Sequence, residues 1–390
     1  MTSDRLLNAL SHHATPCYYY DMDVLNQSLE QVQLHGIQKG YHVHFALKAN
    51  HEPKILQHIQ KAGLGADCVS GGEVQQALDH GFSPSKIAFA GVGKTDEEMI
   101  LGLKNDLFCF NVESYEELLV LNNLASMLGK KARVALRLNP NVAVQTHKYI
   151  TTGLHENKFG ISDDELVEVL NYLPDAKAID FLGVHFHIGS QITELSPFEQ
   201  LCKKCNEYVR FIESKGLQVR VLNMGGGFGV DYENPDQAPY PDFKSFFEVF
   251  DRHLEVRENQ EVHFELGRSI IAQAGSLITK VLYIKERTHK NFAVVDAGMT
   301  ELIRPALYQA VHHIDKLTSD QDSKTSKNIN VYDVVGPICE SSDTFRTGIE
   351  LETLKRGDVL AIRSAGAYGQ VMKSRYNLRP DHPTLYSDEL

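Results

Sequence analysis

Residues 42–62 read HVHFALKANHEPKILQHIQKA. The first part, His42–Ala49, is a short apolar run, and the remainder repeats apolar residues at helical spacing to about Ala62. A strand followed by an amphipathic helix is the unit from which parallel sheets with helical crossovers are built. The number of times the chain repeats this unit therefore decides the fold class.

The same unit recurs along the following 200 or so residues. The further apolar runs are Gly65–Ser70, Lys86–Gly91, Leu107–Val112, Arg133–Pro140, Phe181–Gly189, Val219–Gly226 and Val262–Gly267. Eight strand–helix units within about 225 residues predict a closed (β/α)8 TIM barrel. An open doubly wound parallel sheet is the alternative, because strand order cannot be seen in a sequence.

The pattern changes after about residue 268, where the helical period fades. Four later runs have strand character: Ser276–Glu286, Asn291–Asp296, Ile329–Val335 and Asp358–Ala365. They predict a C-terminal antiparallel β domain. We expect the barrel over residues 25–265 and the β domain over residues 266–390. The short aromatic strand Cys17–Tyr20, within residues 1–24, is assigned to the β domain in this prediction.

The composition limits the class of protein. With 390 residues, 42% of them hydrophobic and 23% charged, the chain can form a large packed core. A formal net charge of -12 argues against nucleic acid or an anionic membrane as a general partner. No run is long enough to span a membrane, and the start lacks the pattern of a signal peptide. Six scattered cysteines indicate reduced thiols and a cytoplasmic setting.

Polar residues collect where the predicted barrel strands end, which is where barrel enzymes build their active sites. Lys48 closes the first run, His187 the sixth, Gly225–Gly227 the seventh and Glu265 the eighth. One such residue alone could be a simple strand cap. Several together predict an active site at this end of the barrel.

Lys48 has two interpretations. Its period-two partners, His44 and Ala46, would direct it into the barrel, where a desolvated amine becomes a better nucleophile toward an aldehyde. Alternatively, it is a lysine that extends from a strand end to solvent. The glycine run Gly225–Gly229 could bring bare backbone to a phosphate, or it could simply be a tight turn.

The cysteines and histidines suggest a thiol site rather than a metal site. Cys339 lies in the polar loop Gly336–Asp343 and is either a functional thiol or a half-buried structural one. Cys202 and Cys205 form a CxxC pair within a helical pattern, without a second pair at zinc-site spacing, so no metal site is predicted. The pair His312–His313 has no accompanying ligand pattern either.

Taken together, and in this order, nine segments resemble the family of barrel-fold pyridoxal-phosphate-dependent decarboxylases. The segments are Phe45–Asn50, Gly65–Glu73, Asn157–Gly160, His185–Gln191, Gly225–Gly227, Glu265–Ser269, Arg304–Tyr308, Cys339–Asp343 and Gly366–Gly369. The resemblance runs along nearly the whole chain. It implies a TIM barrel with a β domain and pyridoxal 5'-phosphate as the cofactor.

Within that family, the chain is most similar to members that act on meso-2,6-diaminopimelate. This implies decarboxylation of that substrate to L-lysine and carbon dioxide, the last step of lysine biosynthesis. The alternatives are a decarboxylase of ornithine or arginine, a racemase on the same fold, and a non-catalytic cofactor-binding homologue. The loop sequence Cys339-Glu340-Ser341 argues against ornithine, Glu265 argues against a racemase, and Lys48 together with Cys339 argues against a non-catalytic protein.

The resemblance also implies roles in cofactor binding. Lys48 would hold the cofactor covalently, His187 would stack on its ring, and Glu265 would pair with the pyridine nitrogen. The phosphate would be held or approached by Ser190, Gly226, Gly227, Gly267 and Arg268. The family usually has proline where this chain has Leu266. Because proline shapes the backbone, this difference bears on the phosphate loop rather than on the reaction class.

A second set of residues would bind the substrate. The resemblance implies that Arg268, Arg304 and Tyr308 hold its distal carboxylate. Glu340 would take the distal ammonium, Tyr368 would touch both cofactor and substrate, and Cys339 would return a proton to the α-carbon. It further implies a homodimer with shared active sites, in which the Cys339 loop comes from the other subunit.

Overall fold

The computed structural model describes residues 3–142, 158–318 and 328–390. Its contacts divide the chain into two compact units, which are described separately below. The barrel unit comprises Leu29–Gly229 and Asp242–Gly267. The β unit comprises Met1–Ser28, Val230–Pro241 and Arg268–Leu390. Asn157, the first residue of one of the predicted motifs, lies outside the described residues.

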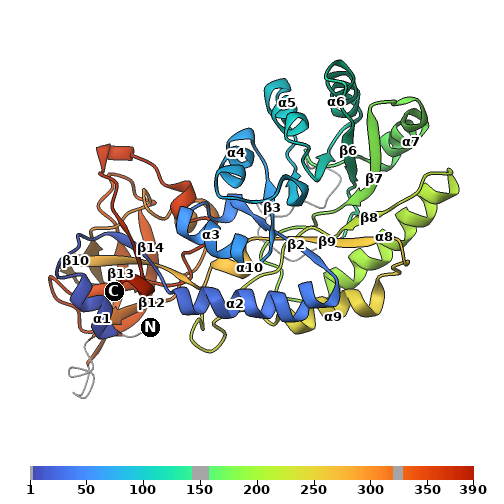
Figure 1. The fold of residues 1–390 in the computed structure, drawn as a ribbon. Coiled ribbons are helices and arrows are strands. Elements are labelled where there is room, and N and C mark those ends of the chain that lie inside the picture. The colour runs from blue at the N-terminus through green and yellow to red at the C-terminus, as the bar shows by residue number, and fades with distance from the viewer. Residues whose placement is uncertain (1–2, 143–157, 319–327) are drawn as a thin grey trace. The chain divides into compact units, whose positions relative to one another are not determined.

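The barrel unit is built around a closed ring of eight strands (Figure 1). Every strand runs parallel to its neighbours, and the last strand pairs with the first. The strands are β2 (His42–Ala46), β3 (Gly65–Cys68), β4 (Ile87–Phe89), β5 (Cys109–Val112), β6 (Ala132–Arg137), β7 (Ile179–His185), β8 (Val221–Asn223) and β9 (Glu261–Leu266). The predicted TIM barrel is therefore confirmed, and the open sheet is excluded.

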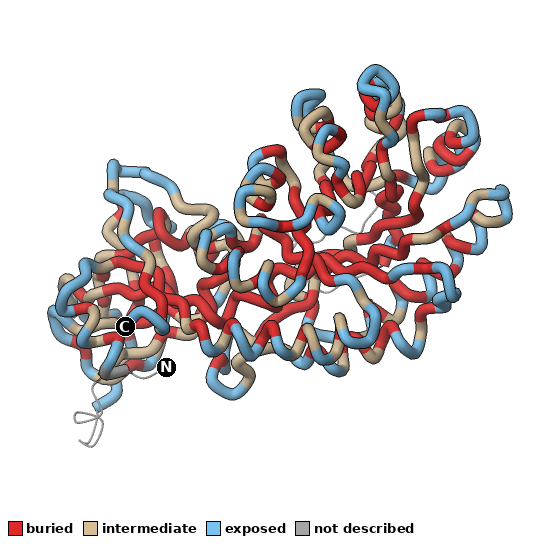
Figure 2. The backbone as a smooth tube through the Cα atoms, viewed as in Figure 1, coloured by how far each residue is buried: buried red, intermediate tan, exposed pale blue. Residues whose placement is uncertain are grey.

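Helices surround the barrel strands, and several of them begin with a side-chain cap. They are α3 (Pro53–Lys61), α4 (Gly71–Asp79), α5 (Asp96–Lys104), α6 (Tyr115–Met127), α7 (Asp163–Tyr172), α8 (Ser196–Ser214) and α9 (Phe243–His253), preceded in the chain by α2 (Met22–His35). Thr95, Ser114 and Ser162 each accept a hydrogen bond from the backbone N–H three residues on, which satisfies a donor that the helix leaves open. Figure 2 shows buried strands enclosed by helices whose outer faces are exposed.

The strand that carries the predicted lysine is shorter than expected. β2 ends at Ala46, and Lys48 lies in a 3-10 turn, Leu47–Ala49, that leads toward α3. The Asn50 N–H donates to the Leu47 carbonyl oxygen and closes this turn. The strict alternation of strand side chains therefore does not extend to Lys48, and the turn sets its direction instead.

The β unit contains an eight-stranded sheet. Its strands are β1 (Cys17–Tyr20), β10 (Gly275–Arg287), β11 (Lys290–Val295), β12 (Ile314–Leu317), β13 (Ile329–Val335), β14 (Thr344–Glu352), β15 (Val359–Ile362) and β16 (Thr384–Tyr386), and its helices are α1 (Ser3–Ala9), α10 (Arg268–Ile271) and α11 (Arg304–Tyr308). The sheet is mostly antiparallel, as predicted, but β11 pairs with β13 in parallel and β1 with β16 in parallel. In this sheet, β1 also pairs with β10.

Three strands of the β unit, β12, β14 and β16, were not predicted from the sequence. β14 reads TFRTGIELE and is largely polar, with Gly348 in the left-handed region at a φ of 63°. A half-exposed strand with a glycine irregularity lacks the clear alternation that identifies a strand. Its assignment depends on pairing with β13, which the sequence does not reveal.

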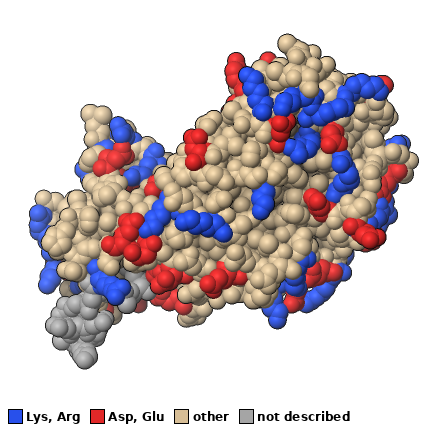
Figure 3. All heavy atoms as spheres, in the orientation of Figure 1, with Lys and Arg blue, Asp and Glu red and all other residues tan. Residues whose placement is uncertain are grey.

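Surface features are consistent with a mixed-charge exterior. On the face shown in Figure 3, acidic and basic side chains are interspersed. None of the described helices is both long and apolar enough to cross a membrane. All six cysteines are unpaired, and only Cys339 is exposed.

Candidate active site

The carboxyl ends of the barrel strands surround a cavity of about 410 Å³. Lys48, His185, His187 and Glu265 contribute to its wall. The remaining wall is formed by Val69, Ala90, Gly91, Val92, Gly93, Arg137 and Phe159. The structure thus brings three predicted residues, Lys48, His187 and Glu265, to a single cavity in the barrel unit.

Glu265 is a buried carboxylate that three side chains hold in place. Asn111 and Asn223 donate from their amide nitrogens to Oε1 at 2.8 and 2.7 Å. His185 Nε2 lies 2.9 Å from Oε2. Burial alone would raise the pKa of Glu265, but His185 and Lys48 outweigh it and hold that pKa below its usual value. The carboxylate therefore stays ionised inside the barrel.

Lys48 is paired with a second buried acid. Its Nζ donates to Asp67 Oδ2 at 3.2 Å. Burial and the nearby Glu265 charge raise the pKa of Asp67 to about 6, although Lys48 opposes the shift. Among the described residues, Asp67 Oδ1 has no hydrogen-bond partner. The Lys48 side chain is 35% exposed, but its amine lies in the cavity wall and pairs with a buried carboxylate, and this argues against the interpretation of Lys48 as a lysine that extends to solvent.

His187 lies half-buried in the same cavity wall. Burial, together with the charges of Lys48 and Arg137, holds its pKa well below the usual value, so the imidazole is neutral. A neutral ring can stack on an aromatic cofactor. His185 Nδ1 is buried and lacks a hydrogen-bond partner in the described part of the chain.

The glycine run after β8 is required by close backbone contacts. A Cβ on Gly226 would lie 2.0 Å from the Glu265 carbonyl oxygen. A Cβ on Gly227, at a φ of 105°, would lie 2.5 Å from the Gly189 carbonyl oxygen. The Ile192 N–H donates to the Gly227 carbonyl oxygen, so the loop that contains Ser190 runs beside the glycine run. These backbones form a cradle at the carboxyl end of β7 and β8.

Gly267 follows the eighth strand at a similarly crowded position. An added Cβ would approach the Ala49 and Ala46 side chains at 2.9 and 3.1 Å. Leu266, the departure from the family pattern, is buried at the end of β9 and pairs in register with Phe45. The strand therefore keeps regular pairing with β2 through this position.

The β unit contains a separate cluster of buried arginines. Arg268 and Arg304 are both buried, and their guanidinium carbons lie 5.9 and 4.7 Å from the centre of the Tyr232 ring. Arg268 Nη1 donates to the Tyr232 hydroxyl at 2.6 Å. Burial would raise the pKa of Tyr232, but the two arginines outweigh it and lower that pKa below its usual value. Two guanidinium groups therefore contact the same phenol ring.

Other aromatic and polar groups complete this cluster. Arg304 Nη1 donates to His312 Nε2 at 2.9 Å, and the opposite nitrogen of His312 bonds to the Arg363 carbonyl oxygen. Arg268 also stacks over Tyr368 at 4.9 Å. Tyr308 ends α11, the helix that Arg304 begins. Within the described residues, Arg304 forms no ion pair with a carboxylate, so the cluster presents positive charge.

Cys339 and Glu340 are exposed in a loop of the β unit that Asp343 organises. The Asp343 carboxylate accepts from the backbone N–H groups of Ile338 and Met299 at 2.7 and 2.6 Å. The Cys339 N–H donates to Asn377 Oδ1, and the Tyr376 hydroxyl donates to Glu340 at 2.6 Å. The thiol is thus held at the surface by a fixed loop rather than buried in the core.

Sequence reasoning missed several of these residues. Asn111 and Asn223 lie inside strands, and Asp67 was noted only as part of a motif. A polar residue within an otherwise apolar barrel strand is the signal that could have identified all three. Tyr232 lies in a loop without a motif, and His312, which the pattern left without a role, bonds to Arg304.

Comparison with known proteins identifies the class. The model of the pyridoxal-binding domain of pyridoxal-dependent decarboxylases matches residues 25–272. The chain belongs to this family, which confirms the resemblance deduced from its motifs and makes pyridoxal phosphate its cofactor.

Individual relatives show which members of the family the chain is similar to. The chain is 50% identical over 377 residues to a diaminopimelate decarboxylase from Bacteroides thetaiotaomicron, covering 96% of each chain. It is 39% identical to one from Aquifex aeolicus, covering 94% of this chain and 85% of the relative. A crystal structure of diaminopimelate decarboxylase from Helicobacter pylori, complexed with L-lysine, superposes with a TM-score of 0.91 at 38% identity, covering 99% and 94% of the two chains.

The residues of the barrel cavity fit pyridoxal phosphate. A buried carboxylate is available for a protonated ring nitrogen, an amine for the aldehyde, and a neutral imidazole for the ring face. The backbone cradle near Gly226 and Gly227 admits a phosphate, since added side chains there would collide with main-chain atoms.

Proposed function

We propose that this chain removes carbon dioxide from meso-2,6-diaminopimelate and releases L-lysine, as the last step of lysine biosynthesis. The observation that carries the reaction class is the ionised Glu265 in the Lys48 cavity. The substrate is supported by the relatives, which are diaminopimelate decarboxylases at up to 50% identity.

Three of the proposed cofactor-binding residues, Lys48, His187 and Glu265, are supported by the cavity that they line. Lys48 would attach the cofactor, His187 would stack on its ring, and Glu265 would pair with the ring nitrogen and keep it protonated. Ser190, Gly226, Gly227, Gly267 and Arg268 would hold the phosphate. When bound, pyridoxal phosphate accepts the electron pair that carbon dioxide leaves behind. A protonated ring accepts that pair best, and the fixed donors around Glu265 preserve the charge that protonation requires.

Selectivity for diaminopimelate requires recognition of its distal carboxylate and ammonium. Arg268, Arg304 and Tyr308 bind the carboxylate, and the positive cluster around Tyr232 supports this role. Glu340 binds the ammonium, and Tyr368 contacts both substrate and cofactor. Ornithine, arginine and lysine lack the distal carboxylate, so the arginine cluster discriminates against them.

A direct test uses the purified chain loaded with pyridoxal phosphate. It is incubated separately with meso-diaminopimelate, L-lysine, L-ornithine and L-arginine, and the carbon dioxide released is measured. We expect release from meso-diaminopimelate alone, with L-lysine as the second product. Faster release from ornithine or arginine would reassign the substrate, and no release from any of the four would mean a non-catalytic homologue.

Cys339 is the proposed proton donor to the α-carbon, and it acts in a homodimer with shared active sites. The support is an exposed thiol on a well-anchored loop of the β unit. In a twofold dimer, one patch contacts its counterpart reciprocally, so two equivalent sites form together.

Complementation tests the shared site. Lys48→Ala and Cys339→Ala homodimers are each expected to be inactive or nearly so. When the two variants are dissociated and reassembled together, mixed dimers contain one site with both defects and one with neither, so activity returns. If mixed dimers form and activity stays absent, the two residues act within one chain.

We further propose a cytoplasmic setting. The support is the set of six unpaired cysteines, since reduced thiols are typical of that compartment.

A further inference from the structure

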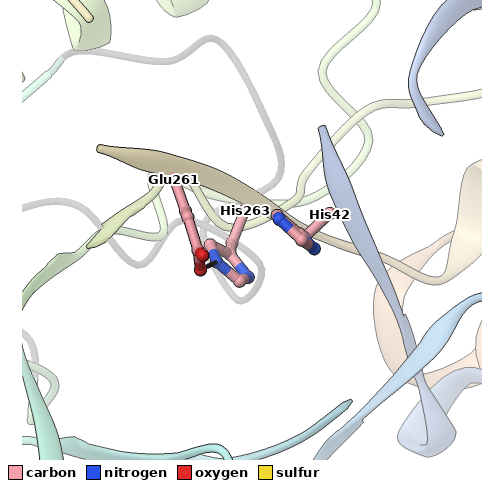
Figure 4. A group of neighbouring side chains, drawn as sticks. All are labelled: His42, Glu261 and His263. Carbon is pink, nitrogen blue, oxygen red and sulfur yellow. Dashed lines mark hydrogen bonds and ion pairs between the residues drawn. The ribbon is translucent and has the colours of Figure 1, made fainter. Parts of the chain in front are cut away.

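A second polar cluster lies at the opposite, amino-terminal end of the barrel strands. His42 begins β2, while Glu261 and His263 lie on β9 (Figure 4). His42 pairs in register with His263, and Glu261 is two positions earlier on β9, so all three side chains share one face of the sheet. One donor atom from each residue lies within 4.8 Å of the others.

The His263 ring has a fixed plane. It stacks with the His42 ring, 4.5 Å away at an interplanar angle of 14°, and with the Phe108 ring, 4.6 Å away at 16°. Its side chain is only 3% exposed. His42 and Glu261 are exposed, so the His42 ring can rotate out of this stacked arrangement and direct a ring nitrogen toward the Nε2 side of His263.

A chain of hydrogen bonds also fixes which nitrogen of His263 carries the proton. His44 Nδ1 lies 3.0 Å from the Lys86 carbonyl oxygen, which can only accept, so this nitrogen carries the hydrogen of a neutral His44. His44 Nε2 is then an acceptor, and His263 Nδ1, 2.9 Å away, donates to it. The remaining nitrogen of a neutral His263, Nε2, therefore presents a lone pair.

That lone pair faces a carboxylate. His263 Nε2 lies 3.3 Å from Glu261 Oε2. A divalent cation placed between this nitrogen and the carboxylate would accept an electron pair from each.

We propose that His42, Glu261 and His263 bind a divalent transition-metal ion of the zinc class. Imidazole and carboxylate are suitable donors for Zn²⁺, and three protein ligands leave a fourth position for water. A metal-binding histidine usually donates its other N–H to an acceptor that fixes the ring, and the relay from His263 through His44 to Lys86 supplies that arrangement.

The position of the site gives it a structural role. β2 and β9 are the first and last strands of the barrel, and their pairing closes it. A metal ion bound by residues of both strands would stabilise the pairing that closes the barrel. The site lies at the amino ends of the strands, whereas Lys48 and Glu265 lie at the carboxyl ends, so metal binding is separate from the chemistry of the cofactor.

The test is a zinc titration of the chelator-treated holoenzyme, followed by calorimetry and by thermal unfolding. We expect one tight equivalent of Zn²⁺ per chain and a rise in Tm on binding. His42→Gln and Glu261→Gln should each raise the Kd for this Zn²⁺ ion by roughly 100-fold or more. Even the loss of a residue that only hydrogen-bonds to a metal ligand weakens metal binding 10- to 100-fold. Both positions are exposed, so both variants should fold.

Two matched variants make the result decisive. His289→Gln removes an exposed histidine from the β unit, and Cys339→Ser removes the exposed thiol. Both should keep the tight equivalent and its Tm rise. The proposal is overturned if the wild-type holoenzyme shows no tight equivalent, if His42→Gln and Glu261→Gln bind like the wild type, or if Cys339→Ser abolishes binding.

Discussion

The barrel unit and the β unit each bury charge, but with opposite sign and different partners. In the barrel, the Glu265 carboxylate is surrounded by two amides and an imidazole. In the β unit, Arg268 and Arg304 surround the Tyr232 phenol. Burying a charge is costly unless it is paired, and a phenol compensates two guanidinium groups less completely than fixed donors compensate one carboxylate.

The carboxylate cluster of the barrel and the arginine cluster of the β unit are suited to different tasks. A fully hydrogen-bonded anion keeps its charge through the reaction and can stabilise a protonated cofactor ring. A cluster of buried guanidinium groups attracts an anionic substrate group. Changes in the barrel cluster should therefore affect the chemical step, and changes in the arginine cluster should affect substrate binding.

The largest effect is expected for Lys48→Ala. Without its amine, the barrel site cannot attach the cofactor, so activity should fall at least about 1,000-fold, the scale seen when a nucleophile is removed. The visible absorbance of the lysine-bound cofactor should disappear as well. Lys61→Ala, an exposed lysine on α3, is the control and should keep both signals. Near-normal turnover without added amine would show that the assignment is wrong.

A smaller loss, confined to the chemical step, is expected for Glu265→Gln. A neutral amide cannot hold a protonated ring by charge, so kcat should fall by about 100- to 1,000-fold while KM changes little. Steady-state kinetics give both values, with Glu258→Gln in the exposed loop before β9 as the control. A change in KM alone would show that Glu265 acts in substrate binding rather than in the chemical step.

Arg304→Ala should change binding instead. Loss of a charge-assisted contact of about 1.5–3 kcal/mol should raise KM for meso-diaminopimelate roughly 10- to 150-fold. The product L-lysine retains the distal carboxylate, so its inhibition constant should rise to a similar extent, whereas that of 1,5-diaminopentane, which has no carboxylate, should change much less. Arg356→Ala, an exposed arginine of the β unit, serves as control. Equal weakening of meso-diaminopimelate and 1,5-diaminopentane would indicate a structural arginine.

The smallest effect is expected for Tyr232→Phe. The ring stays between the two arginines, but the hydroxyl that accepts from Arg268 is lost. One hydrogen bond of about 0.5–1.5 kcal/mol corresponds to a rise in KM of roughly 2- to 10-fold. An unchanged KM, measured beside Tyr283→Phe on an exposed strand residue, would show that the phenol does not position the arginines.

The barrel was predictable because its local pattern is strong. Buried parallel strands contain apolar runs such as Leu182–Val184, and several of the helices between strands begin with clear caps such as Ser114. The β unit was less predictable, since polar strands such as β14 depend on pairing with distant partners. The turn at Lys48 was missed because an apolar run continues to Ala49 although the strand ends at Ala46.

The candidate site was predictable where a residue belongs to a motif. Lys48, His187 and Glu265 were identified and line one cavity. Asn111 and Asn223 hold Glu265 from other strands of the barrel, and His312 bonds to Arg304 from the segment that follows α11; spacing alone does not reveal such contacts. Their contributions depend on tertiary geometry, which the order of residues does not show.

The pairing of β2 with β9 has a consequence for how the chain is made. His44 and His263 are 219 positions apart, so the barrel cannot close until synthesis has passed β9. Until then, β2 and β8 expose unpaired edges, which favour aggregation during folding. Since Glu265 lies on that last strand, its contacts with Asn111 and His185 also form at closure. A nascent chain therefore acquires its protected sheet edges and its cofactor-binding acid in the same late event.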